Sequence, residues 1–157
     1  MQEYYYKSPI GILKIVYIEN RLYSLSPTRD FEFSNIETDF TKNIKSQLDE
    51  YFIGKRTNFD IKLNPQGTDF QKKVWQELIK IPYGKTKSYS DIAEHIGNKN
   101  ALRAVGTACN KNPILIIIPC HRVISKNGKI NGFAYGINMK EKLINLEKYN
   151  NNLFNIR

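Results

Sequence analysis

Cys120 and His121 place a thiol and an imidazole next to each other in the chain. A cysteine is a nucleophile only as its thiolate, so the thiol pKa has to fall from an ordinary value of about 8.5. A neighbouring histidine is one of the usual ways to lower it. The apolar run at residues 114–118, just before Pro119, predicts a buried strand. We therefore expect a reactive sulfur held at the end of a rigid element.

The other candidate reactive residues do not suggest a metal site. The chain has two cysteines, Cys109 and Cys120, and two histidines, His95 and His121. They show neither C-x-x-C nor H-x-x-x-H spacing, so no zinc or other metal is expected. Without a secretion signal, a structural disulfide is not expected either. We interpret Cys109 as inert packing, with an oxidant-sensitive thiol as the alternative.

The elements that position Cys120 fall into two parts. Three apolar stretches separated by turn signals predict antiparallel strands at residues 4–6, 10–18 and 22–25. Helical spacing then predicts a helix over residues 40–52, which ends near Gly54, and residues 59–63 predict one more strand. The linker is expected at residues 64–67, which gives two domains, 1–63 and 68–157.

The second part predicts mainly helices. The expected starts of its first three helices are Thr68 or Asp69, Ser88 or Ser90, and Asn98 or Asn100. The first of these helices ends before Pro82, and the third has the apolar residues Leu102, Val105 and Ala108. The two short helices meet at residues 97–99, which fits a helix-turn-helix.

After the strand at 114–118, residues 123–130 predict a hairpin about Asn127-Gly128, a strong turn pair. A last helix is expected at residues 138–149, and the tail 150–157 is expected to fray. The fold class is therefore α+β. A small N-terminal antiparallel sheet with a helix packs on a mostly helical C-terminal domain that contains a helix-turn-helix.

Charge is distributed unevenly along the 157 residues. The net charge is +9, and all of this excess lies after residue 62. A basic domain beside a neutral one is typical of polyanion binding, and a lysine-rich surface that only aids solubility is the alternative. No apolar run approaches the roughly 20 residues that span a bilayer, and no signal peptide is evident. We expect a cytoplasmic protein with no membrane partner.

Several motifs around Cys120 resemble one known family, the O6-alkylguanine-DNA alkyltransferases (methylated-DNA–protein-cysteine methyltransferases). The motifs are Pro119-Cys120-His121-Arg122-Val123, Arg103-Ala104-Val105-Gly106, Asn112-Pro113, Gly132-Phe133-Ala134 and Leu146-Glu147. The resemblance covers residues 68–149, and the preceding part is similar only in its strand-then-helix order. It implies that Cys120 takes an alkyl group irreversibly from O6 of guanine, with O4 of thymine as a further candidate.

The resemblance also implies roles for the residues around the thiol. No cofactor is expected, the partner is double-stranded DNA that contains O6-alkylguanine, and the protein is expected to be a monomer at the prokaryotic nucleoid. His121 takes the thiol proton through a bridging water, and Glu147 orients His121. Tyr89 donates a proton to the guanine, and Asn112 braces the segment that carries the site. The alternatives are a buried histidine, a solvated Glu147 and a tyrosine that only packs.

On the DNA side, the resemblance implies that Arg103 fills the space left by a nucleotide rotated out of the duplex. Ala104 and Thr107 provide a helix surface that approaches the backbone closely. The candidate phosphate contacts are Lys85, Lys87, Lys99, Lys111 and Arg122, with a solvated side chain as the alternative for each. The expected pocket wall is Val123, Phe133, Ala134 and Tyr135. Ala134 stands where several relatives have Ser, and Tyr135 where some have Gly, so the accepted alkyl size stays open.

Two rival functions remain at this stage. A binding module that recognises alkylated bases without repairing them is one, but relatives of that kind lack the cysteine. A cysteine hydrolase that uses Cys120 and His121 is the other, and it would pass through an acyl intermediate with turnover. The basic second part and Arg103 have no role in a hydrolase.

Overall fold

The computed structural model describes residues 1–29, 35–130 and 132–156, with side chains to residue 152. Its N-terminal part is an antiparallel sheet of β1 (Gln2–Ser8), β2 (Gly11–Ile18) and β3 (Arg21–Pro27), in that spatial order. Alternate residues of β1 and β2 are buried, as one-sided sheets require. The described part of the chain contains no helix that is both long and apolar enough to cross a bilayer.

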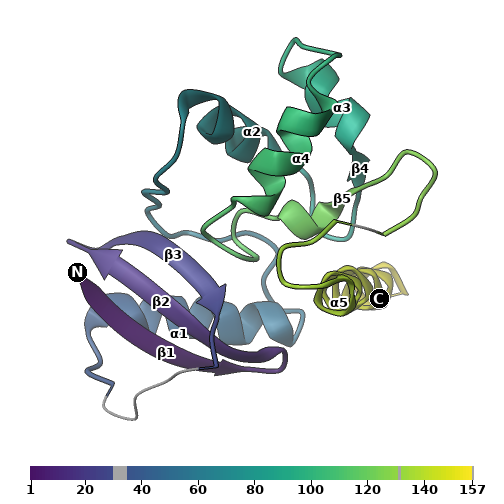
Figure 1. Ribbon diagram of the computed structural model, residues 1–157. Helices are drawn as coiled ribbons and strands as arrows, with labels where there is room; N and C mark the ends of the chain where they lie inside the picture. Colours follow the sequence, from purple (N-terminus) through teal and green to yellow (C-terminus); the bar gives the residue numbers. More distant parts are fainter. Residues whose placement is uncertain (30–34, 131, 157) are drawn as a thin grey trace.

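Helix α1 (Asp39–Phe52) lies against one face of this sheet (Figure 1). Thr38 caps its first turn in a reciprocal capping box with Thr41. Ile44, Leu48 and Tyr51 are buried against the sheet and the core. The predicted meander and helix are confirmed.

The predicted strand at residues 59–63 is wrong. Only Leu22 and Leu63 form a bridge in this segment, with hydrogen bonds on either side of Leu22. The buried Gln47 side chain forms hydrogen bonds with both backbone groups of Asp60. It donates to the carbonyl oxygen at 3.0 Å and accepts from the N–H at 2.9 Å. A side chain therefore replaces the strand partner that the apolar pattern suggested.

The helical part contains α2 (Asp69–Ile79), α3 (Tyr89–His95) and α4 (Leu102–Asn110). Thr68 and Ser88 cap α2 and α3 through capping boxes, so the earlier of the two predicted starts is correct for each helix. Helix α4 starts at Leu102 without a side-chain cap, so its predicted start at Asn98 or Asn100 is wrong. Both asparagines belong to the turn instead, where the Asn98 side chain accepts from the Asn100 N–H.

The predicted strand at residues 114–118 is also wrong. These residues form successive turns, with a single bridge between Ile114 and Leu25 of β3. Ile116 has a φ of +72°, a region that β-branched residues rarely enter. All five side chains are buried, so the apolar run reflects enclosure on every side and not a strand.

Cys120 follows in a one-turn 3₁₀ helix, Cys120–Arg122. The chain continues into β5 (Val123–Ile124), which pairs in parallel with β4 (Lys87–Ser88). A tight turn closes between Ser125 and Lys129, but within the described residues it has no second strand. The turn at Asn127-Gly128 is confirmed, and the hairpin is not.

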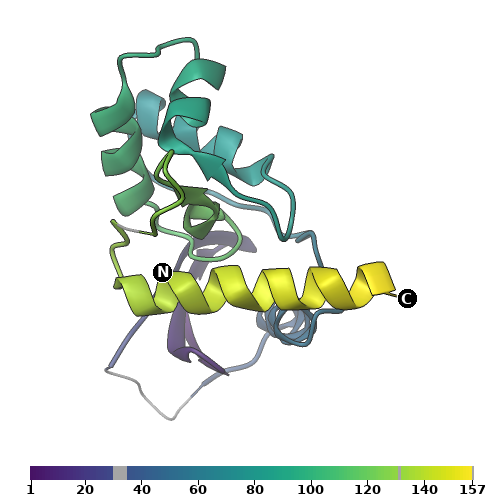
Figure 2. The same ribbon diagram turned by 90° about the vertical axis from the view of Figure 1, so that its right-hand side faces the viewer.

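Helix α5 (Ile137–Ile156) runs across the junction of the two parts (Figure 2). It extends well past the predicted end at residue 149, so the prediction of a frayed tail is wrong up to residue 156, and Arg157 lies outside the described residues. Asn150 is buried and donates to the Tyr83 hydroxyl at 3.0 Å. Its side chain also lies against Gly54, which follows α1. These contacts hold the second half of the helix in place.

Candidate active site

The carboxylate of Glu147 on α5 is the centre of a buried polar network. Its Oε2 lies 2.5 Å from His121 Nε2 and accepts from the Tyr51 hydroxyl at 2.6 Å. Arg122 donates to both oxygens, at 2.7 and 3.2 Å, and the Gly84 N–H adds a longer bond. Burial alone would raise the pKa of Glu147, but His121 and Arg122 outweigh it and lower this pKa to about 2. Glu147 is therefore ionised at neutral pH.

The ionised carboxylate fixes the state of His121. Burial lowers the pKa of this histidine, although Glu147 opposes the shift, so the neutral ring is favoured at neutral pH. Its Nε2 then carries the proton that is donated to Glu147, and Nδ1 is left as the basic nitrogen. In the described part of the chain, Nδ1 has no hydrogen-bond partner. The ring therefore presents an unprotonated nitrogen on the side away from Glu147.

Cys120 itself is 5% exposed. Burial raises the pKa of its thiol, while a hydrogen bond from Asn112, the positive charge of Lys140 and backbone N–H groups oppose the rise. The expectation that the thiol pKa falls is thus wrong for the protein alone, because loss of hydration outweighs every favourable partner. The resting sulfur is a neutral thiol.

Asn112 braces the segment that leads to Cys120. Its side-chain amide donates to the Ile118 carbonyl at 2.7 Å and accepts from the Ile114 N–H at 2.9 Å. Both ends of the turn-rich segment are therefore tied to one buried side chain. The position of Cys120 depends on this amide.

Lys140 is a buried cation of the site that the sequence interpretation missed, as it missed the Tyr51 hydroxyl on Glu147. It is fully buried, and its ammonium lies 3.3 Å from the Tyr89 hydroxyl and over the rings of Tyr89 and Phe133. Burial lowers the pKa of Lys140, and the nearby thiols of Cys109 and Cys120 oppose the shift. The sequence contained a signal, because Lys140 lies at helical spacing from Leu143 and Glu147, which places the three residues on one face of α5.

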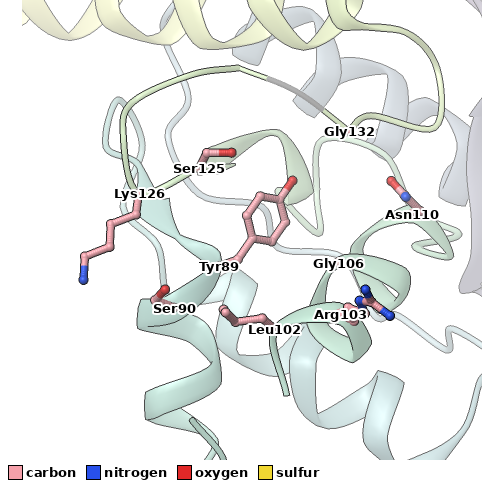
Figure 3. A pocket seen from close by; sticks show the side chains of 9 residues that line it. All are labelled: Tyr89, Ser90, Leu102, Arg103, Gly106, Asn110, Ser125, Lys126 and Gly132. Carbon is pink, nitrogen blue, oxygen red and sulfur yellow. The ribbon is translucent and has the colours of Figure 1, made fainter. Parts of the chain in front are cut away.

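Tyr89 connects this interior to the surface. Burial raises the pKa of its hydroxyl to about 12, and the neighbouring thiols of Cys109 and Cys120 add to the effect. The hydroxyl therefore stays protonated and able to donate at neutral pH. The same side chain lines an open groove (Figure 3).

The groove has a volume of about 460 Å³. Its walls come from α3, α4 and the segment after β5, and its lining residues are Tyr89, Ser90, Leu102, Arg103, Gly106, Asn110, Ser125, Lys126 and Gly132 (Figure 3). Of these, the sequence interpretation gave chemical roles to Tyr89 and Arg103 and placed Gly106 and Gly132 in the family motifs. The exposed side chains of Ala104 and Thr107 lie on α4 outside the groove lining, and Lys85, Lys87, Lys99 and Lys111 are exposed too.

Arg122 does not fit its predicted contact with a DNA phosphate. Its side chain is buried, it binds Glu147, and it donates to the Ile81 carbonyl at 2.7 Å. A basic residue next to the thiol looked like part of the DNA surface, but the buried carboxylate of Glu147 needs a cation. Arg122 therefore belongs to the charge network.

The four predicted pocket residues are placed differently from one another. Val123 is fully buried, Ala134 is exposed, and Phe133 packs edge-on against Tyr135 with ring centroids 5.8 Å apart. Burial raises the pKa of the Tyr135 hydroxyl, and the charge of an ionised Cys120 would add to the rise. Within residues 1–29, 35–130 and 132–156, no cluster of His, Cys, Asp or Glu is arranged to hold a metal ion.

The site combines a thiol with an imidazole–carboxylate pair, and Tyr89 connects this interior to a groove at the helix-turn-helix. This combination defines a class of DNA-acting proteins with a cysteine nucleophile. Two family models match the chain. The 6-O-methylguanine DNA methyltransferase, DNA binding domain, matches residues 69–149, and the ribonuclease-like domain of the same family matches residues 1–65. The chain belongs to the 6-O-methylguanine DNA methyltransferase family.

Individual relatives support the same family membership. The methylated-DNA–protein-cysteine methyltransferase of Methanosarcina mazei is 47% identical over 150 residues, which cover 92% of this chain and 95% of that protein. The solved structure of the Mycobacterium tuberculosis O6-methylguanine methyltransferase has a TM-score of 0.84 at 42% identity, covering 95% of this chain and 94% of that one. The solved structure of the M. tuberculosis OGT in complex with DNA has a TM-score of 0.85, also at 42% identity, covering 96% of this chain and 94% of that one.

Proposed function

We propose that this protein repairs O6-alkylguanine in double-stranded DNA by transferring the alkyl group to the sulfur of Cys120. The observation that carries this assignment is the buried pair of His121, which directly follows the cysteine, and Glu147, with His121 Nδ1 left as the basic nitrogen. The names of its relatives, methylated-DNA–protein-cysteine methyltransferases, support the same reaction.

The first step is removal of the Cys120 proton. Because the resting thiol is neutral, the proton leaves as the sulfur attacks, and His121 Nδ1 takes it directly or through a water. The imidazolium that results is stabilised by the ionised Glu147 at 2.5 Å. Arg122 and Tyr51 hold that carboxylate in place.

In the transfer step, a sulfur–carbon bond forms as the carbon–oxygen bond at guanine O6 breaks. The electron pair of the broken bond stays on guanine, which needs a proton to leave as a neutral base. Tyr89 is the proposed donor, and Lys140 beside its hydroxyl would stabilise the phenolate that remains. The product is a thioether, which no residue in the site can cleave, so each molecule reacts once.

The lesion has to leave the helix to reach this interior site. Helix α4 is the proposed DNA-contacting element, with Arg103 at the groove filling the vacated position. Lys99 and Lys111 lie exposed near the two ends of α4 and are proposed phosphate contacts. Tyr135 is proposed to limit the size of the alkyl group, because a bulky ring stands where some relatives have Gly and it packs against Phe133.

The protein is proposed to act as a monomer, on chromosomal DNA in the cytoplasm of a prokaryote. Residues 1–63 and 68–157 are proposed as its two domains, and the Tyr51–Glu147 bond ties the first to the site.

The test is a duplex with a labelled methyl group on guanine O6. Label should move to Cys120 and stop at about one equivalent, with the modified residue located by peptide mapping. Cys120→Ala should bind the duplex but accept no label, while the matched control Cys109→Ala should accept it normally. Turnover well beyond one equivalent, label on Cys109 alone, or binding without transfer by the wild type would contradict the proposal.

A further inference from the structure

Leu102 is exposed where the sequence predicts a core residue. It shares helical spacing with Val105 and Ala108, which are both buried, yet 45% of its own surface is exposed. A single exposed leucine on a convex surface needs no explanation. This one lines a concave groove together with Arg103 and Tyr89, and in Figure 3 its side chain lies between those of Ser90 and Arg103.

The rest of the exposed face of α4 carries small side chains. A Cβ atom added to Gly106 would meet no atom within 4 Å, so packing inside the protein does not require a glycine there. Ala104 and Thr107 are small and exposed on the same helix. Small side chains allow the backbone of another molecule to approach closely. Leu102 and Arg103 are thus the large side chains at the N-terminal end of an otherwise flat surface.

The positive charge of this part of the chain indicates what kind of molecule approaches α4. The net excess of positive charge lies entirely after residue 62, in the part that contains α4. A polyanion is therefore the fitting partner, and the flat helix surface suits the narrow groove of a DNA duplex. Proteins that bind there commonly insert an apolar wedge such as leucine between base steps, which bends and opens the duplex.

From this placement we infer that Leu102 is a second insertion residue. Successive helical residues point about 100° apart, so Leu102 and Arg103 enter the duplex in different directions. Arg103 takes the place of the extruded nucleotide, and Leu102 packs against the adjacent base on the side of Tyr89. This inference rests on the proposed function, because it assumes that α4 carries Arg103 into the DNA.

The experiment compares two substrates for each variant. One is O6-methylguanine in a duplex, and the other is the free base O6-methylguanine, which needs no extrusion. Leu102→Ala should react about fivefold more slowly with the duplex at limiting protein, which corresponds to losing the burial of roughly half a leucine side chain. Its rate with the free base should equal that of the wild type.

Two further variants make the result specific. Leu102→Met keeps an apolar side chain of similar volume and should restore most of the duplex rate. Ile79→Ala removes a similarly exposed residue, 48% exposed at the end of α2, and should leave both rates unchanged.

Equal duplex rates for the wild type and Leu102→Ala would overturn the inference, as would an equal loss on both substrates, which would indicate damage to the fold or the thiol. A wild type that reacts with neither substrate would overturn the proposed function instead.

Discussion

Replacing Glu147 with glutamine removes one buried negative charge while nearly preserving the shape of the side chain. The pKa of Glu147 is lowered from 4.5 to about 2. At about 1.4 kcal/mol per pH unit, this difference corresponds to roughly 3 kcal/mol of stability at neutral pH. Removing one partner of a buried ion pair typically costs about 3–5 kcal/mol, which agrees. We expect Glu147→Gln to lower the free energy of unfolding at pH 7 by about 3 kcal/mol.

The same shift predicts how the wild type responds to acid. Since the folded-state pKa lies below the ordinary value of 4.5, the stabilisation from Glu147 is complete above pH 4.5. It is lost progressively as the pH falls through about 2, where the folded-state carboxylate becomes protonated. Urea unfolding followed by fluorescence would measure the loss of stability in Glu147→Gln at pH 7. The same assay at intervals below pH 5 would measure the loss of stability of the wild type in acid.

The matched control is Glu141→Gln on the same helix. Glu141 is exposed, so its loss should change stability by no more than about 0.5 kcal/mol. Folded Glu147→Gln should also transfer methyl groups roughly 10³–10⁴-fold more slowly, because the imidazolium that forms on His121 loses the negative charge that stabilises it. If Glu147→Gln unfolds at the same urea concentration as the wild type, the buried network does not carry the charges described here.

Three further predictions concern the groups around the sulfur. Cys120 should react slowly with iodoacetamide at pH 7 in the absence of DNA, because burial raises the pKa of its thiol; labelling as fast as that of a small thiol would contradict this. Tyr89→Phe should slow methyl transfer from duplex DNA by about 100-fold, since it removes the general acid, and an unchanged rate in a single-turnover assay would exclude that role. Lys140→Met should raise the pKa of Cys120 further, because the ammonium opposes the effect of burial. The pH dependence of thiol alkylation would measure the change, and a lower pKa would contradict the described arrangement.

Local signals gave most of the elements correctly. The helix starts at Thr68 and Ser88 can be predicted from the sequence, because all the residues of a capping box lie within four positions of one another. The sheet follows from alternating apolar residues and turn residues between them. Such features depend on neighbours in the chain, so the sequence contains what is needed to predict them.

The errors arose where distant residues decide the structure. The apolar run before Cys120 indicates burial, but whether a buried segment is a strand depends on an available sheet edge, and here Asn112 and a single bridge to β3 replace it. Burial of α5 against both parts determines that Lys140 lies inside and that the helix continues past residue 149. Arg122 could be placed only once its carboxylate partner 25 residues away was located.

The hydroxyl of Tyr51 donates to the carboxylate that orients the imidazole, although 96 positions separate the two residues. Loss-of-repair alleles should therefore also arise in the codons for α1, far upstream of the cysteine codon. Anyone who grafts the C-terminal half onto a foreign partner would have to supply an equivalent phenol at that junction.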